Sequence, residues 1–187
     1  QAPLMHLARL EQSLGQVEEA IARYREMRER DPGNQGLGLI LATLYERQGK
    51  TEAAMAVYRE VLEANPGSLL AANNLAFYYA EFQPEEGKLE EALKLIERPL
   101  KERPDAPSIV DTAAWIHYRM GNLEKARDLM LSVEEKIGEA GILNYHLGMI
   151  YLGLGEKEKA APRLRTAVES EGDFPGKEEA RKALEGL

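Results

Sequence analysis

The feature that most constrains the fold is an internal repeat with a spacing of 34 residues. A glycine, an alanine five residues later and a large apolar residue four residues after that recur in the same order along the chain. The first two occurrences are Gly15, Ala20 and Tyr24, then Gly49 and its followers Ala54 and Tyr58. A fixed period of this length indicates a repeat architecture, in which each unit packs mainly against its neighbours.

The pattern divides the chain into five units, of which the third is longer. The spacing rises to 38 between Ala54 and Ala92, because four residues are added just before Gly87 in "EFQPEEGK". We expect one repeat domain over 1–187, with units 1–34, 35–68, 69–106, 107–140 and 141–174 and a last segment 175–187. The equivalent glycines are Gly15, Gly49, Gly87, Gly121 and Gly155, and the equivalent alanines are Ala20, Ala54, Ala92, Ala126 and Ala160.

Each unit predicts a helix, a glycine turn and a second helix. Apolar residues recur at three- and four-residue spacing on both sides of the turn. Glycine suits the left-handed residue that follows a helix C-terminus, and a column of alanine lets two helices approach closely. Segment 175–187 predicts a capping helix, because Ala180, Ala183 and Leu184 share one face.

The pattern resembles the tetratricopeptide repeat, whose signature is W-x2-L-G-x2-Y, then A-x3-F, then P. The best single match is "NYHLGMIYLGLGEKEKAAPRL", with Leu147, Gly148, Tyr151, Gly155 and Ala160 in register. The resemblance implies an all-α fold, namely a right-handed superhelical solenoid of five helix-turn-helix units plus a C-terminal capping helix. Two departures affect the tyrosine of the first helix, which is replaced by Glu11 in the first unit and His117 in the fourth.

Composition excludes several function classes. The net charge of -8 disfavours nucleic acid as a partner, because a polyanion would be repelled. The absence of cysteine excludes disulfides, thiolate metal sites and cysteine nucleophiles. No apolar run approaches the roughly 18 residues needed to cross a membrane, so we expect no direct membrane insertion. No phosphate-binding or dinucleotide-binding glycine motif is present, and we expect no cofactor.

The stretch "VDTAAWIHYRMGN" places an acid and a base close together in sequence. At about 100° per residue, Asp111 and His117 lie about 120° apart on a helix and cannot meet across it. The other histidines, His6 and His146, have no acid or histidine at ligand spacing. We therefore expect neither a metal site nor catalytic residues, and we expect that the protein is not an enzyme.

The family resemblance implies that function resides in a concave groove lined by the first helix of each unit, which binds a peptide or helix of a protein partner. Carried over to this sequence, each unit contributes a stripe at i, i+4 and i+7. The stripe becomes largely aromatic from Phe77 onward, and Trp115 is the first candidate for a binding anchor. The partner-binding residues expected are Met5, Arg9, Leu39, Thr43, Asn73, Phe77, Asp111, Trp115, Tyr118, Tyr145 and Met149, with Gln12, Glu46, Ala80 and Leu152 completing the stripes.

Other interpretations stay open. The aromatic rings could instead pack against neighbouring first helices, or a missing segment of the same chain could fill the groove. The array could form homo-oligomers, act as a spacer in a larger assembly, or serve as the regulatory arm of an enzyme domain that is not present here.

A narrower resemblance connects "NNLAFYYAE", "VDTAAWIHYRMGN" and "NYHLGMIYLGLGEKEKA" to the C-terminal repeats of bacterial envelope and exopolysaccharide-associated proteins of this family. It implies a bacterial protein in a periplasmic or membrane-associated setting, with the cytoplasm as the alternative. Because no cap precedes the first unit, we also expect that the sequence is a fragment of a longer protein.

Overall fold

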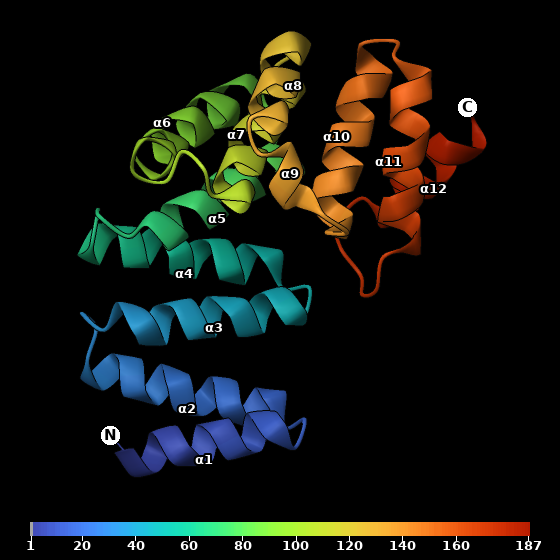
Figure 1. Ribbon diagram of the computed structural model, residues 1–187. Coiled ribbons are helices and arrows are strands. Elements are labelled where there is room, and N and C mark those ends of the chain that lie inside the picture. The colour runs from blue at the N-terminus through green and yellow to red at the C-terminus, as the bar shows by residue number, and fades with distance from the viewer. Residues whose placement is uncertain (1) are drawn as a thin grey trace. The chain divides into compact units, whose positions relative to one another are not determined.

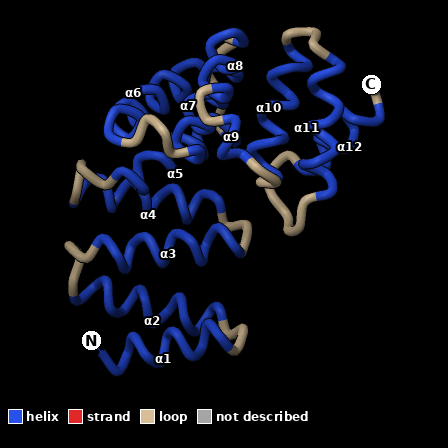
Figure 2. The backbone as a smooth tube through the Cα atoms, in the orientation of Figure 1, coloured by secondary structure: helices blue, strands red, loops and turns tan. Residues whose placement is uncertain are grey.

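The computed structural model describes residues 2–187, with side chains from Leu4 onward, and its regular elements in that range are all helices (Figure 1, Figure 2). The prediction of an all-α fold is confirmed. Contacts divide the chain into two compact units, residues 1–78 and 79–187, and each is described by itself. The prediction of a single domain over 1–187 stays a prediction.

The first compact unit is a stack of antiparallel helices, seen in blue to green in Figure 1. It contains the helices α1 (Ala2–Ser13), α2 (Val17–Arg30), α3 (Gln35–Arg47), α4 (Thr51–Ala64) and the larger part of α5 (Leu69–Phe82). Each helix from α1 to α3 packs on the next one along the chain. In the turns α1–α2 and α3–α4 glycine supplies the left-handed residue, as at Gly49 with φ 66°, whereas the α2–α3 connection contains Pro32.

The second compact unit is also built from helix pairs. After the end of α5 come α6 (Glu86–Glu102), α7 (Pro107–Arg119), α8 (Leu123–Leu131), α9 (Glu134–Ile137), α10 (Gly141–Gly153), α11 (Lys157–Glu169) and α12 (Lys177–Glu185). Helix α10 contacts α7, α8, α11 and α12. The last helix, α12, confirms the helix expected in segment 175–187, and its Ala180 is fully buried.

The alanine column has the packing role that its spacing predicts. All five alanines are completely buried, and so are the large residues four positions later, none of which exceeds 2% exposure. Because alanine presents only a methyl group, the two helices of a pair approach closely there, and the larger side chain fills the space one turn further on. The alanines are Ala20, Ala54, Ala92, Ala126 and Ala160, and the large residues are Tyr24, Tyr58, Ile96, Met130 and Leu164.

Two local expectations were wrong. Gly87 does not close a turn, since it is the second residue of α6, and the turn instead contains Pro84, which cannot continue α5. The second helix of the fourth repeat is interrupted between α8 and α9. At this break the Ser132 hydroxyl donates to the Leu129 carbonyl at 2.7 Å, and Val133 beyond it is buried.

Candidate functional site

In the first compact unit, four of the residues expected in the groove surround one hollow. Arg9 and Gln12 of α1 face Leu39 and Thr43 of α3 across a cavity of about 300 Å³. Arg9 and Thr43 are exposed, whereas Leu39 is half-buried. Met5 is half-buried and does not line this cavity. The hollow therefore offers an apolar wall with a cation and a hydroxyl at its edge.

Asn73 and Phe77, which the sequence analysis also assigned to the groove, lie on α5. Asn73 is 8% exposed and its amide donates to Asn74 Oδ1 at 3.2 Å. Phe77 is half-buried and meets Tyr78 edge-on, with ring centroids 5.8 Å apart. Asn73 is thus part of the packed interior, while Phe77 keeps part of its ring accessible.

A partly buried hydrogen-bond network supports this helix. Asn74 donates its amide to the Tyr58 hydroxyl at 2.7 Å, and Tyr58 in turn donates to Glu46 Oε1 at 2.7 Å. Burial raises the pKa of Tyr58 well above its ordinary value, and the neighbouring Glu46 carboxylate raises it further. The tyrosine therefore stays a neutral donor at ordinary pH and connects α3, α4 and α5.

In the second compact unit, Trp115 is enclosed rather than exposed. Only 1% of its surface is accessible, and its ring stacks on both Tyr118, with centroids 4.6 Å apart, and His146, at 4.0 Å. Its indole nitrogen donates to Glu81 Oε2 at 2.8 Å. Trp115 therefore does not present its ring as an exposed anchor in this structure.

His146 also brings an acid and a base together, which the sequence analysis missed. Its Nδ1 lies 2.9 Å from both carboxylate oxygens of Asp111, and the two residues are 0% and 4% exposed. A helical wheel of α7 correctly places Asp111 and His117 on different faces, but it takes no account of the neighbouring first helix α10. A signal existed, because residue 146 is one position beyond the repeat equivalent of residue 111.

Two of the remaining expected residues of this unit, Tyr118 and Tyr145, pack against the Trp115 ring. Tyr145 is 4% exposed, with its ring centroid 5.6 Å from that of Trp115 and 6.0 Å from that of Phe174. Burial is the main cause that raises the pKa of Tyr145 above its ordinary value. Tyr118 and Met149 are half-buried. For Trp115 and Tyr145 the structure thus shows the packing between first helices that the sequence analysis left open.

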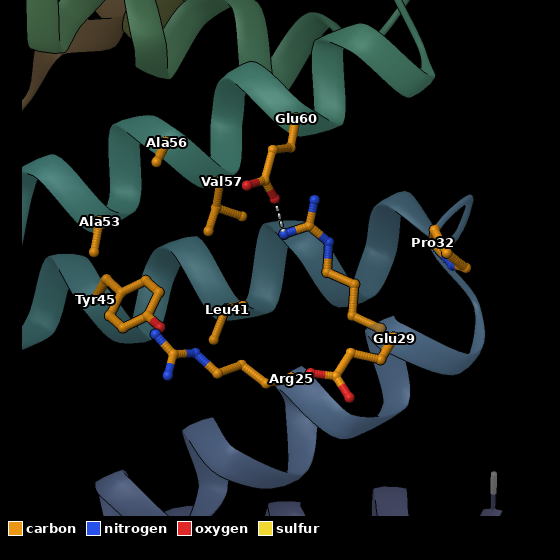
Figure 3. Close-up of a pocket in the computed structure, with 10 residues that line it drawn as sticks. Arg25, Glu29, Pro32, Leu41, Tyr45, Ala53, Ala56, Val57 and Glu60 are labelled. Carbon is orange, nitrogen blue, oxygen red and sulfur yellow. Dashed lines mark ion pairs between the residues drawn. The ribbon is translucent and has the colours of Figure 1, made fainter.

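The structure contains a second hollow that the sequence analysis did not identify (Figure 3). Its volume is about 530 Å³, and its walls come from α2, α3 and α4. Leu41 and Tyr45 of α3 face it, roughly half a helical turn away from Leu39 and Thr43. The hollow therefore lies on the other side of α3 from the first one. Its side chains are spaced i, i+3, i+4, i+7 along α2 and the turn that follows it, and again along α4, which the sequence could have revealed: Arg25, Arg28, Glu29 and Pro32, and then Ala53, Ala56, Val57 and Glu60.

Two further observations concern metal binding and membrane crossing. Within the described residues, the histidine, aspartate and glutamate side chains form no group of three or more that could hold a metal ion. Across the same residues, each helix is too short or too polar to cross a membrane.

Comparison with known families identifies repeats at both ends of the chain. One model of the tetratricopeptide repeat matches residues 11–81, and a second model of the same repeat matches residues 143–174. A search of curated protein sequences finds no significant match.

Solved structures with the same fold extend over nearly the whole chain. MamA from Desulfovibrio magneticus RS-1 is 16% identical with a TM-score of 0.72, covering 90% of this chain and 93% of its own. A thermophilic repeat protein from Thermus thermophilus is 17% identical with a TM-score of 0.71, covering 98% of each chain. YrrB, described as having an unusual peptide-binding site, is 19% identical with a TM-score of 0.66, covering 96% of this chain and 91% of its own. The two family matches and this shared solenoid fold agree with the repeat register, and the chain belongs to the tetratricopeptide repeat family.

Proposed function

We propose that the protein is a non-enzymatic interaction scaffold that holds a peptide or helix of a protein partner against the first helices of its repeats. The observation that carries this proposal is the hollow between α1 and α3, where Arg9, Gln12, Leu39 and Thr43 converge. An apolar wall with a few polar groups at its edge is the usual composition of a binding site. The solved structure of YrrB is described as having a peptide-binding site, which agrees with this proposal.

In the second compact unit, the accessible groups differ from the anchor first expected. Met149 is half-buried on α10, one turn beyond Tyr145. Tyr118 and Arg119 are half-buried beside the enclosed Trp115, and the Arg119 guanidinium lies 5.8 Å from the centre of the Trp115 ring. A packed ring beneath them limits the motion of these side chains and lowers the entropy lost on binding. Trp115 would therefore support the binding surface from below, while Tyr118 and Met149 would contact the partner.

Site-specific photo-crosslinking in cells that naturally express the protein tests this proposal. A photoreactive phenylalanine at position 43 lies in the hollow, and the same group in place of the exposed Glu19 on α2 serves as control. We expect a discrete adduct from position 43 alone. It should disappear when Arg9→Glu reverses the charge at the edge of the hollow. Equal adducts from both positions, or an adduct unaffected by Arg9→Glu, would contradict the proposal.

One observation favours self-association as a second function. Leu7 and Leu10 of α1, together with Leu14 just beyond its end, form an exposed stripe, with exposures of 39%, 54% and 65%. The repeat equivalents of Leu7 and Leu10 are Leu41 and Leu44 of α3, which are only 3% and 1% exposed. Such a stripe can bury itself against the same stripe of a second copy. Sedimentation over a concentration series tests this with the parent protein and with Leu10→Glu. We expect the parent to dimerise and Leu10→Glu to remain monomeric. If both proteins dimerise, or neither does, the proposal is contradicted.

A further inference from the structure

The floor of the hollow formed by α2, α3 and α4 (Figure 3) contains a residue that differs in character from its equivalents in the other repeats. This floor is made by Leu41, Ala53, Ala56 and Val57. Ala53 is the one uncharged residue in its repeat column, because the equivalent positions hold Glu19, Glu91, Lys125 and Lys159. A methyl group in place of a long charged side chain leaves an open apolar floor in the second repeat.

Two hydrogen-bond donors border this floor without acceptors. Tyr45 is 4% exposed, and its hydroxyl is buried with no hydrogen-bond partner. The Arg25 guanidinium lies 5.6 Å from the centre of the Tyr45 ring, and within the described part of the chain no carboxylate pairs with it. An unsatisfied buried hydroxyl is costly, so an acceptor placed beside it gains more than an ordinary surface contact.

The other charges of the hollow do not supply that acceptor. Arg28 Nη1 and Glu60 Oε2 form an ion pair at 2.6 Å, which is the dashed contact in Figure 3. Glu29 lies at the same wall but is exposed. The four charged side chains sum to zero, so the local field alone does not attract an anion. Selectivity must come from the unpaired donors, and Glu29 opposes an incoming carboxylate.

We propose that this hollow binds a peptide segment through the side-chain carboxylate of a glutamate or aspartate flanked by an apolar residue. The carboxylate accepts from the Tyr45 hydroxyl and from the Arg25 guanidinium, whose fork matches carboxylate geometry. The apolar neighbour covers Ala53, Ala56 and Val57. A volume of about 530 Å³ accommodates two such side chains and lies within the range of known ligand pockets. The site is separate from the surface of the proposed function, since it lies on the other side of α3.

The test uses two matched tripeptides with the whole chain 1–187, acetyl-Leu-Glu-Leu-amide and acetyl-Leu-Gln-Leu-amide. Amide chemical shifts are followed by NMR as each peptide is added to millimolar concentration. We expect the glutamate peptide to shift amides of α2, α3 and α4 around the hollow. The glutamine peptide should bind roughly three- to tenfold more weakly, because it offers no charged acceptor. Equal binding of both, or no shift with either, overturns the proposal.

Four substitutions locate the binding. Arg25→Gln should reduce the affinity for the glutamate peptide to that of the glutamine peptide, while Arg47→Gln, an equal charge change at an exposed position of α3 outside the hollow, should leave it unchanged. Ala53→Glu should abolish binding by filling the floor with the side chain found in the first and third repeats. Glu29→Gln should tighten binding by removing the opposing charge. Unchanged shifts in Ala53→Glu would overturn the proposal, since binding would then occur elsewhere.

Discussion

The imidazole Nδ1 of His146 lies 2.9 Å from each carboxylate oxygen of Asp111, and this contact joins α10 to α7 inside the second compact unit. Both side chains are buried, and the Trp115 ring covers the imidazole, stacked with its centroid 4.0 Å away. A polar contact with this degree of enclosure fixes the register of two first helices, because neither group can find water if the other moves.

Removing the charge of Asp111 should destabilise the second compact unit. Asp111→Asn keeps the shape of the side chain but weakens the contact with His146, and we expect a loss of about 1–3 kcal/mol in the free energy of unfolding. Urea unfolding followed by fluorescence measures it, because the chain contains a single tryptophan and that residue is Trp115. Asp128→Asn, at an exposed position of α8, is the control and should change stability by less than about 0.5 kcal/mol.

Trp115→Ala should act on stability before it acts on binding. The indole is 1% exposed and is hydrogen-bonded to Glu81, so we expect a loss of about 3–5 kcal/mol. Circular dichroism during urea unfolding measures this loss. Tyr118→Ala, at the half-buried edge of the same stack, should cost less than Trp115→Ala and is the better variant for testing partner affinity. A Trp115→Ala protein as stable as the parent would show that the ring is not part of the core.

Much of the fold follows from the sequence because the information is local. The glycine, the alanine five residues later and the large residue after it all act within one helix pair, and the alanine column is fully buried as its spacing predicts. The turn predicted at Gly87 was wrong because glycine occurs both in turns and in the first turn of a helix. The same residue that ends a helix elsewhere is tolerated in the first turn of α6, where Pro84 had already ended the previous helix.

The candidate site was less predictable because it depends on contacts between helix pairs. A helical wheel places Asp111, Trp115 and Tyr118 on one face, but it does not show that α10 covers that face with His146 and Tyr145. The hollow beside Ala53 is also invisible to a search for polar motifs. The sequence signal for this hollow is an alanine at a position where the other four repeats carry a long charged side chain. This difference becomes visible only when all five repeats are aligned.

His117 should make the protein sensitive to mild acid. Burial lowers the pKa of His117, with a smaller contribution from Lys125, and its Nδ1 is buried without a partner. The folded state therefore binds this proton less readily than the unfolded chain, whose histidine pKa is about 6.5. The contribution of His117 to the free energy of unfolding is therefore fully present above about pH 6.5. It is lost as the pH falls from there through the lower pKa of His117 in the folded protein, by at most about 1.4 kcal/mol per pH unit.

The variant His117→Tyr tests this sensitivity, because tyrosine occupies the same column at Tyr45, Tyr79 and Tyr151. The free energy of unfolding is measured from pH 8 to pH 5 for both proteins. We expect a shallower decline for the variant below about pH 6.5, whatever its stability at pH 8. His6 and His146 are present in both proteins and cancel in the comparison. Parallel curves would show that His117 does not cause the acid sensitivity.

A matched pair of glycines near the C-terminus separates backbone strain from crowding. Gly172 and Gly176 have φ values of 83° and 94°, so alanine is strained at both, by about 1–2 kcal/mol. A methyl group at Gly172 meets nothing within 4 Å, whereas at Gly176 it collides with the Tyr145 ring, which packs between Trp115 and Phe174. Gly176→Ala should therefore cost about 1–3 kcal/mol more than Gly172→Ala in urea unfolding. It should also change the fluorescence of Trp115, and equal effects of the two substitutions would mean that Tyr145 can move aside.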